Sequence, residues 1–571
     1  MLKLKNTLAS MIKDAADALW QDNGLTAEEI AAMLEYPPDE TMGNLALPCF
    51  KLSRTLRSAP PKIAADLAAK IGESDIVEIS VAGGYLNFKI LPAYLTASVL
   101  ASIEESGDAY GKSEMGAGKT VVLDYSSPNI SKPFHIGHLG TTVIGHSLKL
   151  LHEFCGYSCV GINHLGDWGT QNGKQIVAYR KWGNKEAVEE GGIDELVRLY
   201  VRFHEEAEKD PSLNDEARAA FTALEHHDPE CIALWKWFIE ISMQEYQKTY
   251  KQLGIEFDSY NGESFYTDKM PAVVEEIKSK GILKIDDGAS IVDLEEYSMP
   301  PCLILKRDGS TLYPTRDITA ALYRKNTYDF AKCIYVTSAG QSLHFAQWFK
   351  VLEIMGYNWA KDELVHVPYG TVSIGGEKLA TRSGNVILLR DLFAQAIEKV
   401  REIMAVKNPD LKDSDEVAEA VGVGAIIFNY LYNSRIKDIN FSMENALSFD
   451  GSTGPYAQYT YARTCSILVK AADLDLSGEA SLTMPEEATL LITLSKFPEK
   501  VLDAVAQYEP SVITRYVIDV CTAFNRFYQA CPVVTAEDEQ VRATRVRLTR
   551  AAGCVLKNAL HLVCIKTPEK I

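Results

Sequence analysis

The N-terminal part of the chain combines helical and strand patterns of hydrophobic positions. Leu4, Leu8 and Met11 begin a series of apolar residues at intervals of three and four, which is typical of an amphipathic helix. A second helix is expected after the proline pair of SAPPKIAADLAAKIG, and the alternation in YLNFKI predicts a strand. The pattern therefore predicts a small α+β domain over residues 1–110.

The middle of the chain has the pattern of a parallel α/β domain. After a Gly- and Ser-rich stretch at 108–119, which we expect to be a linker, TVVLDYS is a continuous apolar run typical of a buried strand. A loop with prolines leads to a helix that starts near Gly137, and CVGINHL, KCIYVTS and HVPYGTVSI have the pattern of further strands. This order predicts a Rossmann-type parallel sheet over 117–390, with a Glu- and Lys-rich helical insertion near 186–260.

Beyond about Asp413 the pattern is helical almost to the end of the chain. We expect a connecting helical region at 391–450 and an all-α bundle at 451–571, in which AADLDLSGEASLTMPEEA is a polar break. The predicted fold class is α/β: a Rossmann-type parallel-sheet domain with an N-terminal α+β domain and a C-terminal all-α helical bundle.

Composition excludes several classes of protein. Hydrophobic types make up 47% of the 571 residues, so a disordered chain is excluded. No stretch reaches the ~18 uninterrupted apolar residues of a membrane helix, and acidic residues interrupt any signal-peptide core near the N-terminus. Eleven cysteines without a CxxC pair argue against a disulfide framework, and no second pair completes a zinc site with Cys155 and Cys159. We therefore expect a cytoplasmic protein with no membrane contact, no zinc and no metal-ligating residues.

The net charge of −19 is unlike that of most proteins that bind duplex DNA. The C-terminal segment from Val541 to Ile571 nevertheless carries seven basic side chains against one acidic one. A solvated helix face is the commoner interpretation of such a segment, and contact with nucleic acid is the alternative.

The strongest chemical candidate is SSPNISKPFHIGH, in which His135 and His138 flank Gly137 at the mouth of the predicted helix. A helix N-terminus offers free backbone N–H groups and the positive end of its dipole, which suit a phosphate. Gly137 allows close approach to the backbone, and two imidazoles can donate hydrogen bonds to phosphate oxygens as charge builds on them. Two surface histidines near a helix cap, or a metal pair joined by His146 or His152, are alternatives that this motif alone leaves open.

Further segments of the chain favour the phosphate-binding interpretation of this motif over the two alternatives. VVLDYSSPNISKPFHIGHL resembles the HIGH motif of class I aminoacyl-tRNA synthetases in the form found in the arginyl-tRNA synthetase family. NHLGDWGTQ, YPTRDI, IYVTSAGQSLHFAQ and FDGSTGPYAQYTYARTCSIL resemble later segments of that family in the same order, and DETMGNLALPCFKLSR resembles its N-terminal additional domain. The resemblance covers essentially the whole chain.

The resemblance implies an arginine–tRNA ligase. Such an enzyme activates L-arginine with ATP and Mg²⁺ to arginyl-adenylate, releases pyrophosphate, and transfers the arginyl group to the 3′-terminal adenosine of tRNA(Arg). It further implies that tRNA is bound before activation, that residues 1–110 contact tRNA and that the C-terminal bundle binds the anticodon.

A pocket for arginine needs carboxylates and planar acceptors, because a guanidinium is planar, permanently charged and carries five N–H donors. A buried pairing of this kind would reject lysine strongly, so no editing domain is required. Each candidate could instead be a buried polar residue that satisfies loop backbone. The resemblance implies that the arginine contacts are Ser127, Asn129, Asn163, Tyr313, Asp317 and Gln341, with Glu263 as a candidate second carboxylate.

GGEKLATRSGNV stands in the place of the family's KMSKS motif, where Lys378 and Arg382 could clamp the triphosphate of ATP on a Gly-rich loop. No protein nucleophile is needed, because phosphoryl transfer asks mainly for positioning and charge neutralisation. Four residues depart from the usual family pattern: Gly140, Asn172, Leu379 and Ala380. The implied catalytic residues are His135, His138, Lys378 and Arg382, and the implied ATP contacts are Pro128, Lys132, His135, Gly137, His138 and Gly384.

Aromatic and basic residues lie side by side in the C-terminal helical region, which suits stacking on single-stranded bases and contact with phosphates. An aromatic-rich helix is otherwise more often part of a core. The implied tRNA contacts are Tyr456, Tyr459, Arg463, Arg542 and Arg545. We expect a monomer whose partners are tRNA(Arg), L-arginine and ATP.

Two other functions fit parts of this pattern. One is another HxGH-type enzyme, either a synthetase for a different amino acid or a nucleotidyltransferase that does not bind tRNA. The other is a catalytically silent RNA-binding or regulatory paralogue, against which the presence of His135, His138, Asn129 and Lys378 argues.

Overall fold

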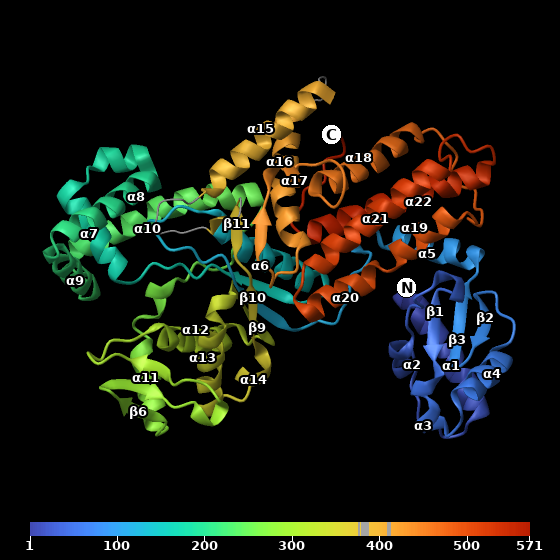
Figure 1. Ribbon diagram of the computed structural model, residues 1–571, viewed down its shortest axis with the longest axis horizontal. Coiled ribbons are helices and arrows are strands. Elements are labelled where there is room, and N and C mark those ends of the chain that lie inside the picture. The colour runs from blue at the N-terminus through green and yellow to red at the C-terminus, as the bar shows by residue number, and fades with distance from the viewer. Residues whose placement is uncertain (375–376, 379–386, 408–412) are drawn as a thin grey trace.

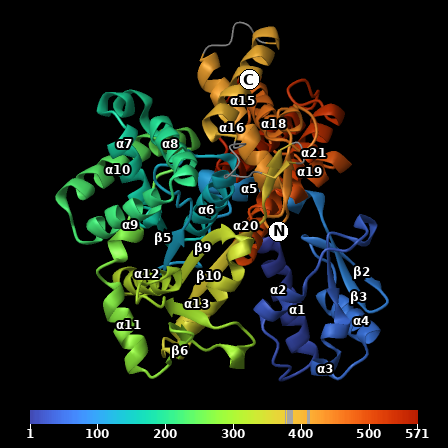
Figure 2. The same ribbon diagram turned by 60° about the vertical axis from the view of Figure 1, so that its left-hand side comes forward.

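The computed structural model describes residues 1–374, 377–378, 387–407 and 413–571. A helical insertion, which runs from α7 (Thr170–Trp182) to α10 (Pro229–Leu253), and the N-terminal unit lie at opposite ends of the molecule. A parallel sheet and the C-terminal helical bundle lie between them (Figure 1, Figure 2). This arrangement confirms the predicted fold class. None of the helices within the described ranges is long and apolar enough to cross a membrane.

The N-terminal unit packs helices against a three-stranded antiparallel sheet. Its strands β1 (Leu45–Pro48), β3 (Tyr85–Ile90) and β2 (Val77–Ala82) pair in that order. The predicted helices and the predicted strand YLNFKI are confirmed. The helices are α1 (Leu2–Leu19), α2 (Ala27–Met33), α3 (Ser53–Leu56), α4 (Pro60–Ile71) and α5 (Pro92–Ser106).

The central sheet has four parallel strands in the order β10-β9-β4-β5. Helix α6 (Ile136–Phe154) connects the two neighbouring strands β4 and β5, as predicted. Because all four strands run in one direction, the loops that follow them meet at one edge of the sheet. The strands are β4 (Thr120–Asp124), β5 (Ser158–Ile162), β9 (Lys332–Ser338) and β10 (Leu364–Tyr369).

The prediction of one strand over HVPYGTVSI was wrong. The chain turns at Gly370, where a Cβ atom would lie 2.4 Å from the carbonyl oxygen of Lys437. The residues before the turn form β10, and those after it form β11 (Val372–Ile374) in a separate sheet. Strand β11 pairs with β12 (Glu377–Lys378) and with β13 (Ile439–Phe441), which lies far along the chain.

Two insertions flank the central sheet. The first is the predicted helical one, and it has its own core around Leu199, Phe203 and Leu224. The second, between α10 and β9, contains a three-stranded antiparallel sheet that the hydrophobic pattern did not reveal. The elements are α7 (Thr170–Trp182), α8 (Lys185–Lys209), α9 (Ser212–Glu225), α10 (Pro229–Leu253), α11 (Met270–Ser279), β6 (Leu283–Asp286), β7 (Ala289–Val292), β8 (Cys302–Leu305) and α12 (Tyr313–Tyr328).

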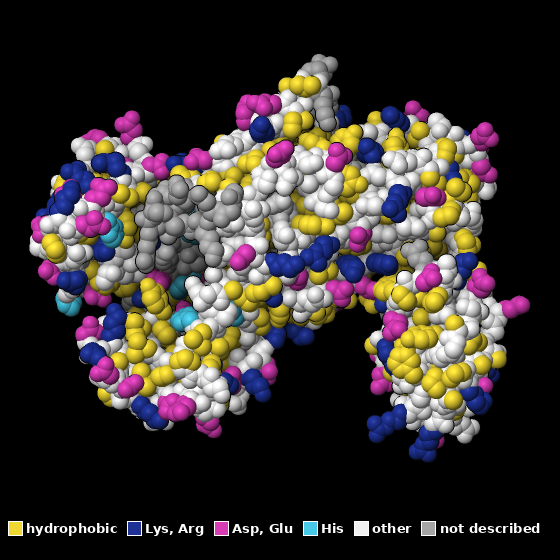
Figure 3. All heavy atoms as spheres, viewed as in Figure 1, with side chains coloured by type: hydrophobic (Ala, Val, Ile, Leu, Met, Phe, Trp, Pro, Cys, Tyr) yellow, Lys and Arg dark blue, Asp and Glu magenta, His cyan; other side chains and the backbone are white. Residues whose placement is uncertain are grey.

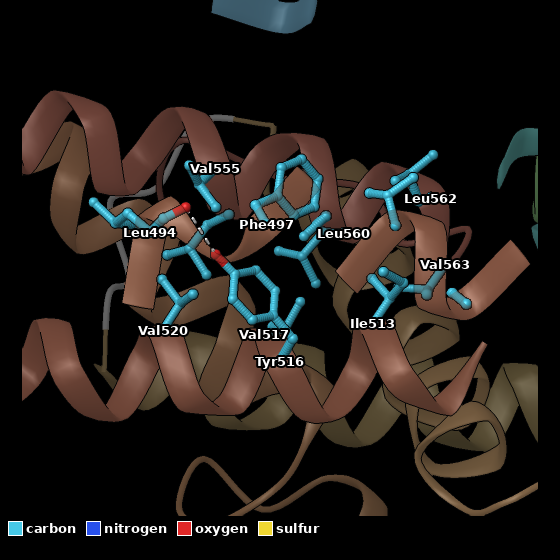
Figure 4. Packing of buried hydrophobic residues seen from close by; sticks show 14 of the residues in the cluster. Leu494, Phe497, Ile513, Tyr516, Val517, Val520, Val555, Leu560, Leu562 and Val563 are labelled. Atoms are coloured by element: carbon cyan, nitrogen blue, oxygen red, sulfur yellow. Dashed lines mark hydrogen bonds between the residues drawn. The ribbon is translucent and has the colours of Figure 1, made fainter. Parts of the chain in front are cut away.

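Helices α13 (Ser342–Ile354) and α14 (Ala360–Glu363) join β9 to β10, and α15 (Leu389–Lys407), α16 (Ser414–Tyr432) and α17 (Met443–Ala446) lead to the bundle. The bundle buries a continuous apolar core between α19, α21 and α22, in which the hydroxyl of Tyr516 donates to the carbonyl of Leu494 (Figure 4). Its helices are α18 (Gly454–Lys470), α19 (Pro485–Ser495), α20 (Phe497–Gln507), α21 (Ser511–Ala530) and α22 (Glu539–Leu562).

The expected linker at 108–119 packs against this bundle instead of spanning freely. The Tyr110 hydroxyl donates to the Leu494 carbonyl at 3.3 Å, and its ring stacks on Phe497 with centroids 6.1 Å apart. A Cβ at Gly111 would lie 2.7 Å from the Phe497 ring, so the backbone itself makes this contact. The segment therefore fixes the bundle to the central domain.

Candidate active site

The loops that follow β4, β5 and α10 form one hydrogen-bonded unit at the carboxyl edge of the sheet. The Gly166 N–H donates to the Pro128 carbonyl at 3.0 Å, and the Ile130 N–H donates back to Gly166 at 3.2 Å. The Glu263 N–H donates to the Leu165 carbonyl at 2.9 Å. The first motif, the NHLGDWGTQ segment and the NGESFY segment are therefore brought together. The surface is hollowed between the helical insertion and the α11–α13 region, and histidine side chains are visible beside the hollow (Figure 3).

The loop after β4 holds three serines in the left-handed region of backbone space, with φ of 71° at Ser126, 48° at Ser127 and 57° at Ser131. This conformation is unfavourable for residues other than glycine and persists only where the surroundings fix it. Tyr250 bonds the Ser126 hydroxyl at 2.8 Å, and the Ser131 N–H donates to the Ser242 hydroxyl at 2.9 Å. Both partners lie on α10, so the helical insertion shapes this loop.

The two histidines of the first motif cap the N-terminus of α6. The Gly137 N–H donates to Nδ1 of His135 at 3.1 Å, and the His135 N–H donates to Nδ1 of His138 at 3.2 Å. Because each Nδ1 accepts a hydrogen bond, the proton of each neutral ring is on Nε2. Both rings, whose centroids lie 3.8 Å apart, therefore carry an Nε2–H donor.

Burial keeps both rings neutral. Loss of solvation, with a smaller contribution from nearby Lys132, lowers the pKa of His135 to about 4. Burial lowers the pKa of His138 to about 3, with His135 and Lys132 contributing in the same direction. Gly137 is required here, because a Cβ would lie 2.8 Å from Cε1 of the His135 ring. The rings therefore act as neutral hydrogen-bond donors at pH 7.

The two histidines that could have joined a metal pair have other partners. Nδ1 of His146 lies 3.3 Å from the Tyr125 hydroxyl, and Nδ1 of His152 lies 2.7 Å from the Leu148 carbonyl. In the part of the chain that the structure describes, no group of three or more His, Cys, Asp or Glu side chains is arranged to hold a metal ion.

The described residues at both ends of the segment GGEKLATRSGNV, which stands in the place of the KMSKS motif, are hydrogen-bonded to neighbouring elements. On one side, Lys378 lies in β12 and pairs with Ser373 of β11. On the other side, the Ile136 N–H donates to the Ile387 carbonyl at 3.3 Å, and the Leu389 N–H donates to Phe134 at 2.9 Å. The intervening chain thus starts and ends at fixed places, the second of them at the N-terminus of α6. Arg382, Gly384, Leu379 and Ala380 lie outside the described residues.

Both predicted carboxylates of the arginine pocket have partners within the chain. Asp317 Oδ2 lies 2.6 Å from Nε2 of His344 in α13. Glu263 Oε1 lies 2.9 Å from Nη1 of Arg316 in α12. Tyr313 begins α12 with 66% of its surface exposed, and Gln341 is exposed at the N-cap of α13.

Two of the predicted arginine contacts, Ser127 and Asn163, also form hydrogen bonds within the chain. The Ser127 hydroxyl donates to the Asp124 carboxylate at 3.0 Å and accepts from the His164 N–H at 3.1 Å. Asn163 is fully buried, and its amide donates to the Tyr250 hydroxyl at 2.9 Å. Its Oδ1 atom has no hydrogen-bond partner among the described residues. Asn129 is exposed, and its side chain lies against Gly166, where a Cβ would overlap it.

The sequence analysis missed three polar residues of this site. Arg324, with 1% of its side chain exposed, pairs with Asp124 at 2.8 Å at the end of β4. Arg316 and His344 each hold one carboxylate of the predicted pocket. Arg316 is adjacent to Asp317 in YPTRDI, and His344 lies in IYVTSAGQSLHFAQ, so their positions in these motifs were the available signal.

Two of the four residues that depart from the usual family pattern, Gly140 and Asn172, lie within the described residues, and each has a packing partner. At Gly140 a Cβ would lie 2.1 Å from the Tyr430 hydroxyl, so this position on α6 accommodates a side chain from α16. Asn172 is buried and donates from its amide to the Asp167 carbonyl at 3.1 Å. Asn172 therefore supports the loop that carries Gly166.

The predicted tRNA contacts fall into two groups. Arg463 lies 5.0 Å from the Tyr459 ring centroid and 5.6 Å from that of Tyr528, and both tyrosines are 41% exposed. Arg545, in contrast, forms a largely buried pair with Glu487 at 2.7 Å. Tyr456 is partly buried and its hydroxyl accepts from Asn525, while Arg542 donates to the Ala536 carbonyl. Arg463 itself is partly buried and donates to Asn525, so the cluster Tyr459–Arg463–Tyr528 is open to a partner mainly through its two exposed rings.

Family models match three consecutive parts of the chain. A model described as "tRNA synthetases class I (R), catalytic domain" matches residues 100–443. "Arginyl tRNA synthetase N terminal domain" matches residues 2–90, and "DALR anticodon binding domain" matches residues 457–571. The class that the fold and the matched site define is therefore that of the class I tRNA synthetases.

Individual relatives narrow the class. The protein named Arginine--tRNA ligase of Alkaliphilus metalliredigens is 49% identical over 96% of this chain and 98% of its own length. The protein of the same name from Clostridium perfringens is 49% identical over 99% and 100%. The chain belongs to the arginyl-tRNA synthetase family. The Thermus thermophilus arginyl-tRNA synthetase structure shares the fold over 100% of both chains, with a TM-score of 0.83 at 24% identity.

Proposed function

We propose that this chain is an arginine–tRNA ligase that makes arginyl-adenylate from L-arginine and ATP and transfers the arginyl group to tRNA(Arg). The observation that carries the proposal is the pair of neutral Nε2–H donors at the N-terminus of α6, in one hydrogen-bonded unit with the loop that carries Glu263. The names of the relatives support the choice of arginine.

In the first step the carboxylate of arginine attacks the α-phosphorus of ATP in line, and pyrophosphate leaves. Such a reaction needs positioned donors where negative charge accumulates, and the Nε2–H groups of His135 and His138 have that chemistry. Since both rings are neutral, they donate without first taking up a proton. Lys378 and Arg382 are proposed to neutralise the departing pyrophosphate.

The groups present suit a nucleotide triphosphate, since the two Nε2–H donors lie at the positive end of the α6 dipole. Mg²⁺ bound with the nucleotide would supply further neutralisation of the phosphate charge. The proposed ATP contacts are Pro128, Lys132, His135, Gly137, His138 and Gly384.

In the second step a ribose hydroxyl of the terminal adenosine attacks the carbonyl carbon of the adenylate, an ester bond forms, and AMP leaves. Selection of arginine is assigned to Asp317 and Glu263, because a guanidinium can donate two parallel hydrogen bonds to a carboxylate. The further proposed arginine contacts are Ser127, Asn129, Asn163, Tyr313 and Gln341.

The bundle is proposed to bind the anticodon region of tRNA through Tyr459 and Arg463, with Tyr456, Arg542 and Arg545 shaping the surface around them. An exposed tyrosine beside an arginine offers stacking and charge together, which is the chemistry that single-stranded bases require. We further propose that the enzyme works as a monomer in the cytoplasm, and the mass of the purified chain in solution tests the first part.

The decisive experiment is aminoacylation of bulk tRNA with each of the twenty amino acids in turn. We expect charging with arginine alone, together with arginine-dependent pyrophosphate exchange that requires tRNA. Charging with another amino acid would identify a different synthetase. Binding of tRNA without any charging would identify a silent RNA-binding paralogue.

A further inference from the structure

One ion pair in the site joins a guanidinium to the carboxylate that the proposed function assigns to substrate arginine. Nη1 of Arg316 lies 2.9 Å from Oε1 of Glu263, with 11% of one side chain and 15% of the other exposed. The Arg316 guanidinium also lies 5.8 Å from the Tyr313 ring centroid. The bond reaches one of the two carboxylate oxygens.

The backbone around Glu263 is fixed. The Glu263 N–H bonds the Leu165 carbonyl at 2.9 Å, and the next residue, Ser264, donates to Asp167 from its N–H at 2.8 Å and from its hydroxyl at 2.6 Å. A Cβ at Gly262 would lie 2.7 Å from the Leu165 carbonyl oxygen, so the turn η4 (Glu263–Tyr266) is held tightly against the loop after β5. The Glu263 carboxylate therefore has a defined place beside α12.

The surroundings of this carboxylate disfavour its charge. Burial raises the pKa of Glu263 to about 7, and the carboxylates of Asp167 and Asp317 contribute in the same direction. Arg316 is the group that opposes them. Besides these three, His344 faces the pocket from α13 through its contact with Asp317. Without Arg316, Glu263 would hold its proton to higher pH.

We propose that Arg316 is a positioning residue of the arginine pocket, which keeps Glu263 ionised and engages one carboxylate oxygen so that the other accepts the guanidinium of the substrate. This inference rests on the proposed function. The carboxylates of Glu263, Asp317 and Asp167 outnumber the Arg316 guanidinium, and Arg324 is already paired with a fourth carboxylate, that of Asp124. The pocket therefore keeps a negative charge for a second cation. A protonated Glu263 would instead donate a proton toward the substrate's own N–H donors.

The test is the pH profile of the KM for arginine between pH 6.5 and 9 in the full chain with tRNA. In Arg316→Gln we expect the pKa of Glu263 to rise by about one unit from its value of about 7. The KM for arginine should then rise about eightfold at pH 6.5 and about threefold at pH 7.5, and recover toward pH 9, because the ionised fraction of Glu263 falls by those factors. The KM for ATP should stay unchanged. Arg316→Lys, which keeps the charge, should restore most of the affinity at pH 7.5.

Two further variants isolate the cause. Glu263→Gln should give a high KM for arginine that no longer depends on pH, which separates Glu263 from Asp167, Asp317 and His344. Arg307→Gln removes an exposed ion pair with Asp287 in the same insertion and should behave as the wild type. If Arg316→Gln does not fold, the Glu263→Gln profile and the Arg316→Lys value still decide the matter.

A KM for arginine that rises by one factor at every pH in Arg316→Gln, or does not rise, would overturn the positioning role. A pH dependence that persists in Glu263→Gln would do the same. A wild-type chain that charges tRNA with another amino acid overturns the proposed function, whereas arginine charging with either of the first two results overturns this inference alone.

Discussion

At the scale of single residues, burial decides how the two histidines of the first motif act. Their Nδ1 atoms are engaged by backbone N–H groups, and loss of solvation keeps the rings neutral. The same burial has a cost at acid pH, since an unfolded chain would protonate histidine near pH 6.5 while the folded chain resists until a much lower pH.

The first prediction concerns this pH dependence. The stability gained by burying neutral His138 is present in full above pH 6.5 and is lost as pH falls toward about 3. At pH 5 the loss should be about 2 kcal/mol for this residue. In His138→Gln, the difference in free energy of unfolding between pH 7 and pH 5, measured with urea, should shrink by about that amount. An unchanged difference would show that His138 takes up a proton as readily in the folded protein as in the unfolded chain.

The second prediction separates the two substrates. Asp317 lies at the start of α12 against His344, and we expect it to bind the guanidinium. Asp317→Asn should raise the KM for arginine about a hundredfold or more, as expected when a charged hydrogen-bond partner is lost. The KM for ATP should change little, and exposed Asp308→Asn is the matched control. Equal losses for both substrates would refute the assignment to the arginine pocket.

At the scale of elements, the site depends on which loops the parallel strands bring to one edge. The loop after β4, the loop after β5 and the turn before α11 are joined by backbone hydrogen bonds, so the main chain positions the side chains that they carry. Helix α6 also packs against α16, α20 and α22, and the Ser147 hydroxyl donates to the Leu562 carbonyl at 2.7 Å. Helix α6 and the bundle therefore share a packing interface.

The third prediction uses the glycine at the start of α6. Gly137→Ala places a Cβ 2.8 Å from Cε1 of His135, so the ring must move. Alanine is the better helix former by about 1 kcal/mol, so the fold should not be weakened. We expect pyrophosphate exchange to fall about tenfold or more while the melting temperature stays the same or rises. Loss of activity and stability together would mean that the glycine has only a packing role.

At the scale of the whole molecule, basic side chains of α22 hold distant parts of the chain together. Arg545 pairs with nearly buried Glu487, and Arg547 bonds Glu104 of α5 at 2.8 Å. Part of the positive charge of the C-terminal segment is therefore neutralised by ion pairs within the protein. The exposed cluster Tyr459–Arg463–Tyr528 has a different character, because its rings face solvent.

The fourth prediction contrasts the two groups. Arg545→Ala leaves Glu487 buried without its partner and should lower the free energy of unfolding by about 3 kcal/mol or more. Tyr459→Ala should leave stability nearly unchanged and weaken tRNA binding by about 1–3 kcal/mol, the usual contribution of one stacked base. Chemical denaturation and filter binding of tRNA measure the two effects. If Arg545→Ala weakened tRNA binding at unchanged stability and Tyr459→Ala destabilised the fold, the tRNA-binding surface would lie elsewhere.

The sequence by itself determined most of the elements and the family. The first helix, the strand YLNFKI and the central strands could be predicted because their hydrophobic periods are local properties of the chain. The HIGH-like motif could be placed at a helix N-terminus for the same reason, since a strand, a loop with prolines and an amphipathic run follow one another.

Tertiary structure alone decided which side chains meet. The pairs Arg316–Glu263, His344–Asp317 and Arg324–Asp124 join segments far apart along the chain, and no periodicity reports such contacts. The split of HVPYGTVSI between two sheets depends on the approach of Lys437 to Gly370, and the packing of the expected linker depends on Phe497. Local pattern fixes what a segment becomes, whereas burial and charge in the site arise only when distant segments are packed together.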